Sequence, residues 1–303
     1  MADRATSVLA RLKNKAMETG RSNQLCLQLF CQEEFLRRLQ RSRYANNMIL
    51  KGGLFIYALT DFDSRVTVDV DFLLQSIPGT PEKLKPVLDE IISANTGNDF
   101  VTFEVTKVDS IAIAKKYAGI GATVIARIKN TRIPFGIDFG VGDVIVPKQE
   151  KRQIPTQLDD FESPLVSAYS VETTIAEKLD AIFILMEYSS RMKDYYDILY
   201  LSRKFDFDGA TFKEAIAQTF VNRNREFGEE QFERFLALGD DAAMQKKWAA
   251  FLRKMDVSEY DFSEVMKALD AFLNDIVIAA VSGQKFTKSW KASDGRWLQT
   301  RKN

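Results

Sequence analysis

Two acidic residues, Asp69 and Asp71, occupy alternate positions in the segment 65–74, RVTVDVDFLL. Successive side chains of a β-strand point to opposite faces, so a strand here would place both carboxylates on one face, with Arg65 and Thr67 beside them. The remaining apolar side chains would face the core: Val66, Val68, Val70 and Phe72. Two carboxylates at this spacing can share a hard cation, and Mg²⁺ prefers a few carboxylates together with water and phosphate oxygens. The pattern therefore predicts a metal site on a strand, with Asp69 and Asp71 as ligands.

A pair of glycines, Gly52 and Gly53, follows Lys51 and precedes an apolar segment that predicts a short helix. Glycine lets the backbone approach a phosphate group closely, and the N–H groups at the start of a helix face an anion. We therefore expect Lys51, Gly52 and Gly53 to bind a nucleotide, together with Arg65 and Thr67 of the acidic segment. The glycine pair and the acid pair predict a metal-dependent nucleotide site.

The sequence contains no histidine. Ser–His–Asp catalysis, Cys–His catalysis and histidine-ligated zinc or iron are therefore excluded. A general base must be a carboxylate, a lysine, a tyrosine or water, and carboxylates acting with Mg²⁺ are the natural remaining chemistry.

A third acid, Asp138, lies in the segment 133–143, IPFGIDFGVGD. In an extended chain the apolar residues take one face, and Gly136, Asp138 and Gly140 take the other. An acid between two glycines has open space around it that a metal or a nucleotide could fill, so Asp138 is a candidate third metal ligand. The alternative is an acid at a sheet edge, with the glycines marking bulges.

Lys178 and Asp194 are further candidates, in the C-terminal half. A lone lysine in a helix is usually a solvated surface residue, but Lys178 has apolar neighbours at helical spacing that allow partial burial. A partly buried lysine needs an anion. Either Asp194 or a nucleotide phosphate could supply it. Asp194 and Asp197 share one face of the next helix, near Arg191. The alternative for this cluster is ordinary ion pairing along a helix, which stabilises little.

The elements that must position these residues divide the chain into three parts. Residues 5–45 have the apolar spacing of amphipathic helices, and residues 46–147 mix strands with helices. The strands expected in this mixed part are 66–74, 100–107 and a hairpin of 122–128 with 133–146, and the helices are 54–59 and 81–94. A polar, proline-containing stretch at 147–164 is the predicted boundary, and the chain after it is expected to be helical to its end.

Composition predicts a globular protein of the cytoplasm. Apolar residues make up 46% of the 303 residues and charged residues 28%, as in soluble domains. No apolar run approaches the roughly 18 residues that span a bilayer, and the first residues lack the apolar stretch of a signal peptide. Cys26 and Cys31 lie in a helical segment at a spacing that does not share a helix face, so we expect no disulfide between them.

The segment 285–303 combines six basic residues with aromatic rings. Basic and aromatic side chains together suit phosphate contacts and base stacking. The alternative is that Trp290 and Trp297 dock on the core while the cations are solvated. Net charge does not decide between the two, because basic and acidic residues balance at 42 each.

Four segments together resemble the AbiEii/AbiGii toxin family: 35–53 (FLRRLQRSRYANNMILKGG), 65–74, 137–143 (IDFGVGD) and 169–200 (YSVETTIAEKL…RMKDYYDILY). Members of this family are toxins of type IV toxin–antitoxin systems with a DNA polymerase β-like nucleotidyltransferase core. The resemblance implies an α+β fold with a mixed sheet core at 46–150. An N-terminal helical segment, 1–45, and a C-terminal helical domain, 163–303, would flank this core, the latter completing the active site.

The resemblance also implies roles for individual residues. Gly52 and Gly53 match the glycine motif that holds the triphosphate, and Asp69 and Asp71 match the metal-binding pair. Asp138 stands where this superfamily often places its third acid. Mg²⁺, or Mn²⁺, is the implied cofactor, and an NTP is the implied substrate.

Lys178 and Asp194 match two further catalytic positions of the family, Lys178 on phosphate and Asp194 orienting it. The implied reaction transfers NMP from an NTP to RNA, with the tRNA 3′ end as the expected acceptor, and the implied partner is a winged-helix antitoxin. Two alternatives stay open. One is nucleotide transfer to a small molecule, as aminoglycoside nucleotidyltransferases perform; the other is a non-catalytic protein that binds GTP or another NTP and acts through a partner.

Overall fold

The computed structural model describes residues 3–65, 67–113, 117–255 and 260–299. The chain forms two compact units. The first comprises Met1–Gly142 and Gln149–Tyr169, and the second comprises Asp143–Lys148 and Ser170–Asn303. Within the described ranges, no helix is long and apolar enough to cross a bilayer.

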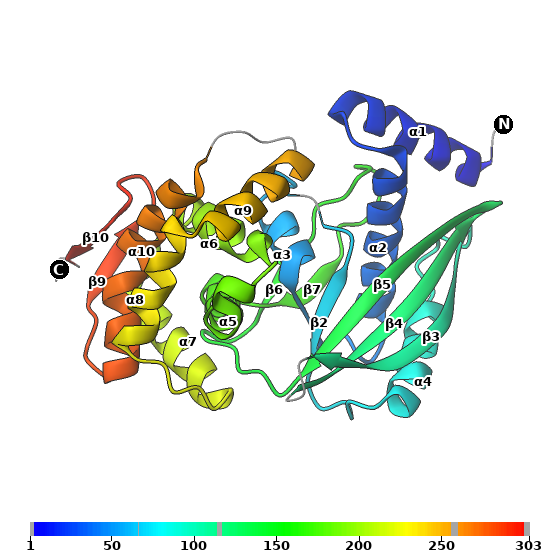
Figure 1. Ribbon diagram of the computed structural model, residues 1–303. Helices are drawn as coiled ribbons and strands as arrows, with labels where there is room; N and C mark the ends of the chain where they lie inside the picture. Colours follow the sequence, from blue (N-terminus) through cyan, green and yellow to red (C-terminus); the bar gives the residue numbers. More distant parts are fainter. Residues whose placement is uncertain (1–2, 66, 114–116, 256–259, 300–303) are drawn as a thin grey trace. The chain divides into compact units, whose positions relative to one another are not determined.

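A seven-stranded mixed sheet is the centre of the first unit (Figure 1). Its strands are β1 (Met48–Lys51), β2 (Val70–Leu74), β3 (Val101–Ile113), β4 (Tyr117–Ile128), β5 (Thr131–Val141), β6 (Glu150–Gln153) and β7 (Leu165–Ala168). They follow the order β3-β4-β5-β2-β1-β7-β6 across the sheet. The β2–β5 and β1–β7 pairs are parallel, and the other neighbours are antiparallel. The expected mixed sheet is confirmed.

The sheet differs from the sequence prediction in several ways, beginning with β3 and β4, which are longer than the expected strands 100–107 and 122–128. β6 lies inside the stretch 147–164 that was expected to be a linker, and β7 begins at Leu165, immediately after that stretch. The sheet therefore extends past residue 150. β5 ends at Val141 and not at residue 146, because the chain from Asp143 to Lys148 belongs to the second unit. β2 begins only at Val70; of the residues expected ahead of it, Val66 lies outside the described residues.

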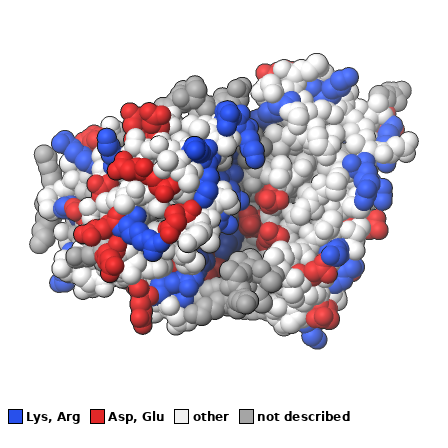
Figure 2. Space-filling view, viewed as in Figure 1, with Lys and Arg blue, Asp and Glu red and all other residues white. Residues whose placement is uncertain are grey.

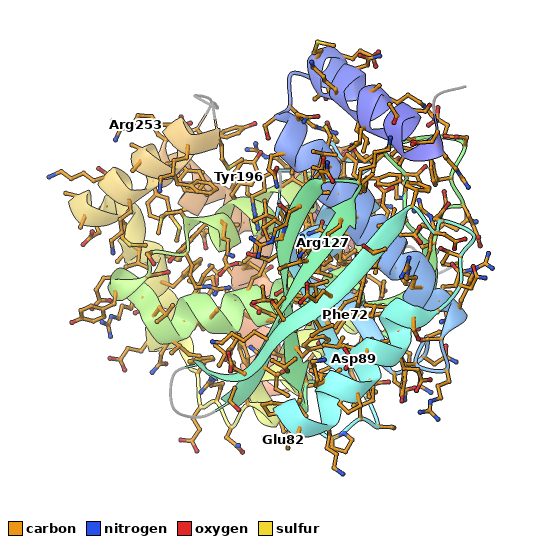
Figure 3. The ribbon with its side chains drawn as sticks, turned by 90° about the vertical axis from the view of Figure 1, so that its right-hand side faces the viewer. Phe72, Glu82, Asp89, Arg127, Tyr196 and Arg253 are labelled. Carbon is orange, nitrogen blue, oxygen red and sulfur yellow. The ribbon has the colours of Figure 1, made fainter. Side chains whose placement is uncertain are left out.

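Three described helices of the first unit pack on this sheet, α2 (Asn23–Arg41), α3 (Gly52–Leu59) and α4 (Pro81–Ser93), and α1 (Arg4–Thr19) packs on α2. Helix α2 contacts β5 and β7, α3 contacts β1 and β2, and α4 contacts β3. The buried side of α4 carries Leu84, Leu88 and Ile91. Glu82 and Asp89, labelled in Figure 3, are exposed on its other side. The amphipathic pattern of α4 therefore sets which side faces the sheet.

A buried ion-pair cluster fixes helix α2 on the sheet. Its members are at most 9% exposed and pair with one another at i, i+3 and i, i+4: Glu33, Glu34, Arg37 and Arg38. Arg38 also donates to the carbonyl oxygens of Ile92 and Val101, and Arg37 donates to that of Glu162. Charges removed from water need complete pairing, so these contacts hold α2 in one position against its neighbours.

The second unit is built mainly of helices: α5 (Val171–Leu185), α6 (Met192–Lys204), α7 (Gly209–Asn222), α8 (Glu229–Ala237), α9 (Ala242–Met255) and α10 (Phe262–Ser282), with short 3₁₀ turns at Met186–Tyr188 and Leu238–Asp240. Helix α10 is the central element, because it contacts α6, α7, α8 and α9. Acidic and basic side chains are interleaved over the outer surface of these helices (Figure 2). This mixture agrees with the balanced charge of the sequence.

The second unit does not end in a helix. Strands β8 (Phe207–Asp208), β9 (Lys288–Lys291) and β10 (Arg296–Gln299) form a small antiparallel sheet in the order β10-β9-β8. The prediction that the chain is helical to its end was therefore wrong. β9 carries Trp290 and β10 carries Trp297, directly opposite each other in the register.

Both tryptophans of this hairpin dock on the helical core. Trp290 is 3% exposed, and its Nε1–H donates to the carbonyl oxygen of Ser202 at 2.6 Å. Trp297 stacks on Phe272 at 6.1 Å and donates to the Phe272 carbonyl at 2.9 Å. Of the two interpretations of this segment, the structure shows docking on the core for both tryptophans, with Trp290 buried and Trp297 partly exposed.

Candidate active site

Four strands of the first unit place one row of residues side by side across the sheet. Lys51 of β1 is the register partner of Asp71 of β2. Asp71 is in turn the partner of Asp138 of β5, and Asp138 is the partner of Gly121 of β4. Residues directly opposite each other on neighbouring strands project to the same face. Lys51, Asp71 and Asp138 therefore share one face of the sheet, and we call them the acid row.

The opposite face of the same strands is the apolar core. Phe72 and Phe139, each next in sequence to an acid, are register partners whose rings stack at 6.0 Å. Phe35 of α2 lies 6.3 Å from Phe72. Asp138 is exposed, whereas Phe139 is 1% exposed, so the predicted alternation along β5 is confirmed. The core contacts of the phenylalanines fix which way the two carboxylates point.

Helix α3 begins against the Asp71 carboxylate. Gly52, its first residue, has φ +68°, and a Cβ on Gly52 would lie 2.1 Å from Asp71 Oδ2. A Cβ on Gly53 would lie 2.6 Å from Thr67 Oγ1. The glycine turn into a helix is confirmed, and the close approach that requires glycine here is to the side chains of Asp71 and Thr67.

Lys51 precedes this turn and completes the basic end of the acid row. Its ammonium lies 3.3 Å from the Tyr169 hydroxyl and 4.9 Å from the centre of the Tyr169 ring. Tyr169 is 1% exposed, so it supports the lysine from the side of β7. The row thus presents a cation and two carboxylates on one face, next to a helix N-terminus.

The chain around Asp69 differs from the prediction. Arg65, Thr67, Val68 and Asp69 lie in an irregular segment ahead of β2, and Val68 is 48% exposed instead of facing the core. The expectation that a strand alone would align Asp69 with Asp71 was therefore wrong. No strand neighbour accepts this part of the chain into the ladder. Asp69 itself is exposed and stands two residues before Asp71.

Two glutamines of α2 hold this irregular segment in place of a strand. Gln28 Nε2 and Gln32 Nε2 both donate to the carbonyl oxygen of Val68, at 2.6 and 2.8 Å. The sequence reasoning missed both residues. The signal that could have found them is a pair of amides one helical turn apart among the buried apolar positions of this helix.

The donor set of the acid row fits a hard divalent cation. Asp71 and Asp138 offer carboxylate oxygens from adjacent strands. Within the described ranges, no three His, Cys, Asp or Glu side chains already form a metal-holding group. Mg²⁺ commonly takes only one or two carboxylates and completes its shell with water and substrate phosphates. An open set of acids is therefore compatible with this ion.

In the second unit, Lys178 of α5 lies between two carboxylates of α6. Its ammonium is 3.0 Å from Asp194 Oδ1 and 2.7 Å from Asp197 Oδ2. Arg191 Nε donates to the other oxygen of Asp194 at 2.5 Å. The side chain of Lys178 is 11% exposed, and that of Asp194 is fully buried. The structure thus brings Lys178 and Asp194 together, with Asp197 as a second partner.

The charge state of Asp194 follows from these contacts. Burial alone would raise its pKa, but Lys178 and Arg191 outweigh that effect and hold the pKa below its ordinary value. Asp194 therefore stays ionised at neutral pH. A carboxylate buried this completely needs both cations, so the cluster is more than the exposed helix ion pairing weighed from the sequence.

A second, partly buried ion-pair cluster of this unit was also missed from the sequence. Arg223, after α7, pairs with Asp143, Glu177 and Asp180 at 2.9–3.2 Å. Burial alone would lower its pKa, but Glu177 and Asp143 hold it above the ordinary value. The cluster ties the short segment after β5 to helices α5 and α7.

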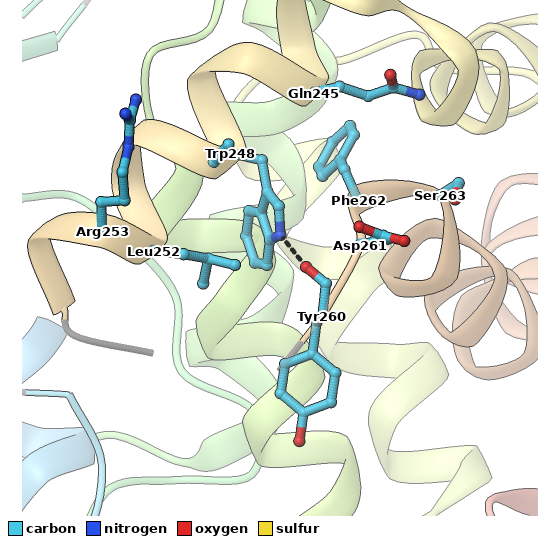
Figure 4. Close-up of a pocket in the computed structure, with 9 residues that line it drawn as sticks. Gln245, Trp248, Leu252, Arg253, Tyr260, Asp261, Phe262 and Ser263 are labelled. Atoms are coloured by element: carbon cyan, nitrogen blue, oxygen red, sulfur yellow. Dashed lines mark hydrogen bonds between the residues drawn. The ribbon is translucent and has the colours of Figure 1, made fainter. Parts of the chain in front are cut away.

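A pocket of about 460 Å³ in the second unit involves none of the predicted site residues. It lies along α9 and the start of α10, and Trp248, Leu252 and Phe262 line it. The Trp248 indole donates to the carbonyl oxygen of Tyr260 at 2.8 Å (Figure 4). Because the polar edge of the tryptophan is already paired with the chain, this pocket is a feature of the helical packing.

A family model described as the nucleotidyl transferase AbiEii toxin of type IV toxin–antitoxin systems matches residues 34–275, most of the chain. The chain belongs to this AbiEii family. It is thus a toxin-type nucleotidyltransferase, as its sequence motifs indicated.

One solved structure supports the fold. The chain is similar to MenT4, a nucleotidyltransferase toxin from Mycobacterium tuberculosis H37Rv, with a TM-score of 0.53 and 14% identity over 91% of this chain and 99% of that one. It is also similar to JHP933 from Helicobacter pylori, with a TM-score of 0.47 and 16% identity over 84% of this chain and 93% of that one. Comparison with curated protein sequences gives no match. At these identities the likeness to MenT4 shows the fold alone.

Proposed function

We propose that this toxin transfers NMP from an NTP to the 3′ end of tRNA in the cytoplasm, using Mg²⁺ or Mn²⁺, and that an antitoxin opposes it. The observation that carries the proposal is the acid row. It brings Asp71 and Asp138 from two different segments onto one face beside the N-terminus of α3. The tRNA end rests on the family resemblance, since the C-terminal tryptophans are used in packing.

Asp69, Asp71 and Asp138 would hold the metal, which would supply positive charge to neutralise the triphosphate as pyrophosphate leaves. Lys51 and the N–H groups at the start of α3 would bind the phosphates, because a helix N-terminus favours an anion. The exposed Asp138 carboxylate would accept the proton of the attacking hydroxyl. This assignment follows from the lack of histidine, which leaves a carboxylate as the natural base.

Lys178 and Asp194 are proposed as the further catalytic positions of the family. Asp194 is buried and ionised, and it orients the Lys178 ammonium through a 3.0 Å contact. The Lys178 ammonium is held between the Asp194 and Asp197 carboxylates, at 3.0 and 2.7 Å. In this proposal Asp194 and Asp197 act as positioning residues for Lys178.

Incubation of the purified protein with each α-labelled NTP, Mg²⁺ and total tRNA tests the proposal. We expect label on tRNA, lost on chelation of the metal. We also expect it to fall at least about 100-fold in Asp71→Asn, the order lost when one charge-stabilising group is removed from an active site. Asp89→Asn, an exposed acid of α4, is the matched control and keeps the activity. Asp71→Ala is expected to abolish growth inhibition while the protein stays folded.

Three outcomes would contradict this function. Label on a small molecule but never on RNA would identify a small-molecule nucleotidyltransferase. Bound NTP with no transfer to any acceptor would identify a non-catalytic nucleotide-binding toxin. A fully toxic, stably folded Asp71→Ala protein would exclude the acid row from the toxic activity.

A further inference from the structure

The carbonyl oxygen of Val68 accepts two side-chain hydrogen bonds from one helix. Gln28 Nε2 donates to it at 2.6 Å and Gln32 Nε2 at 2.8 Å. Residues four apart lie on the same helix face, so both amides reach the same point, and a carbonyl oxygen has two lone pairs to receive them. Gln28 is 8% exposed and Gln32 is 1% exposed. We call this pair the amide clamp.

The clamp acts on the peptide unit that leads into the metal-binding acids. The Val68 carbonyl and the Asp69 nitrogen belong to one planar peptide group, so fixing the carbonyl fixes where the Asp69 backbone starts. β2 begins at the next residue, Val70, and the ladder to β5 then fixes Asp71. Asp71 is thus positioned by the sheet, whereas Asp69 is positioned by two side chains of α2.

The helix that carries the clamp is itself held in place. Further along the same helix, Arg38 donates to the carbonyl oxygens of Ile92 and Val101. Glu33, next to Gln32, accepts the backbone N–H of Gln157 at 3.0 Å. The amide clamp therefore holds the Asp69 segment against a helix that is itself fixed. Within the described part of the chain, Gln32 Oε1 is buried without a hydrogen-bond partner. The orientation of the Gln32 amide is thus set by the hydrogen bond that its Nε2 donates to the Val68 carbonyl oxygen.

We propose that Gln28 and Gln32 are positioning residues of nucleotide transfer: the amide clamp holds the Val68–Asp69 peptide so that Asp69 can bind the catalytic metal together with Asp71. This inference rests on the proposed function for its chemistry and on the two hydrogen bonds for its geometry. Both glutamines precede residue 34, where the family match begins. The clamp is therefore a feature of this chain outside the matched region.

The test compares Gln28→Met, Gln32→Met and the double variant with Gln24→Met. Methionine keeps the length of the side chain and removes the donor, and Gln24 is exposed one turn earlier on the same helix. In the double variant we expect kcat to fall about 100-fold, the order that follows from an ångström-scale misplacement of a reacting group. We also expect the half-saturating Mg²⁺ concentration to rise while KM for the acceptor stays unchanged. Each single variant keeps one donor and should lose less.

A second measurement needs no activity. Hydrogen exchange of the peptide covering 67–72, in the protein without nucleotide and metal, should become faster in the double variant and stay unchanged in Gln24→Met, because local opening sets the exchange rate. Faster exchange together with normal kcat and Mg²⁺ dependence would show a purely structural clamp and overturn the proposal. Unchanged exchange in both single variants would overturn it as well.

The same design separates this inference from the function on which it rests. If the wild-type protein transfers no nucleotide, the proposed function fails. The proposed role of the amide clamp is then tested by Mn²⁺ binding, which is measured as the loss of the electron paramagnetic resonance signal of free Mn²⁺. Weaker Mn²⁺ binding in the single variants than in Gln24→Met supports it, and equal binding refutes it. If the double variant does not fold, the two single variants carry the comparison.

Discussion

Replacing Gly52 by alanine would insert a methyl group where the Asp71 carboxylate now lies. The added Cβ would stand 2.1 Å from Asp71 Oδ2, whereas ordinary van der Waals contact begins at 3.4 Å, so the carboxylate would have to retreat by about 1.3 Å. Gly52 also has φ +68°, a conformation that costs an L-residue about 1–2 kcal/mol. The substitution therefore has a backbone effect on stability and a separate steric effect on one acid.

These two effects have different expected sizes. The backbone effect should lower the unfolding midpoint by about 2–8 °C, since 1 kcal/mol corresponds to roughly 2–4 °C in a unit of this size. The steric effect should lower nucleotide transfer about 100-fold, because ångström-scale misplacement of a reacting group costs that much. Activity should thus fall far more than the loss of stability can explain.

Gly20→Ala is the matched control. Gly20 has φ +69°, almost the same as Gly52, and a Cβ there would meet nothing within 4 Å. The control should show the same loss of thermal stability and full transfer activity per folded molecule. Thermal unfolding and initial transfer rates, measured on both variants at a temperature where both are folded, check this. If Gly52→Ala transfers nucleotide as fast as Gly20→Ala, the contact between Gly52 and the Asp71 carboxylate has no bearing on catalysis.

Two further predictions concern the lysine cluster of the second unit. Lys178→Met leaves two buried carboxylates without their shared cation and should destabilise the protein by about 3–5 kcal/mol. Lys193→Met, at an exposed position, is the control and should change stability by less than about 0.5 kcal/mol. Equal unfolding midpoints of the two variants in urea would contradict the buried pairing. Because the folded-state pKa of Asp194 is lowered, its stabilising effect is present above its ordinary value of 3.8 and is lost as pH falls below that value. Asp194→Asn should therefore be less stable than the wild type at pH 7, and it should lose less stability than the wild type between pH 5 and pH 3. Thermal unfolding midpoints measured across this pH range check this. Parallel curves of midpoint against pH for the two proteins would show that Asp194 is not the titrating group.

Sequence reasoning succeeded where local alternation and sheet geometry agree. Asp138 stands between apolar neighbours that pack on the core, so the alternation of side chains along a strand was enough to predict that Asp138 lies on the exposed face. The glycine turn was equally visible, because Gly52 and Gly53 directly precede the apolar residues of α3. In these places the local pattern and the tertiary contacts require the same arrangement.

The same reasoning failed where a distant element sets the local structure. Val68 looks like one more apolar strand residue, but its carbonyl is bound by Gln28 and Gln32, about forty positions earlier in the chain, and its side chain is exposed. The strands β8 and β9 are also long-range partners, joining Phe207 to Trp290. Alternation within a short window carries no information about such partners.

The parallel pairing of β2 with β5 also has a consequence for synthesis of the toxin. Asp71 and Asp138 lie 67 residues apart in the chain, and β1, beside β2, pairs in turn with β7 at Leu165–Ala168. At about 5–20 residues per second, a ribosome needs roughly 3–13 s to proceed from the first acid to the second. A nascent or truncated chain that stops before β5 holds only one of these two acids. Under the proposed function, the cell that makes this toxin is therefore not exposed to a working site until the first unit is nearly complete.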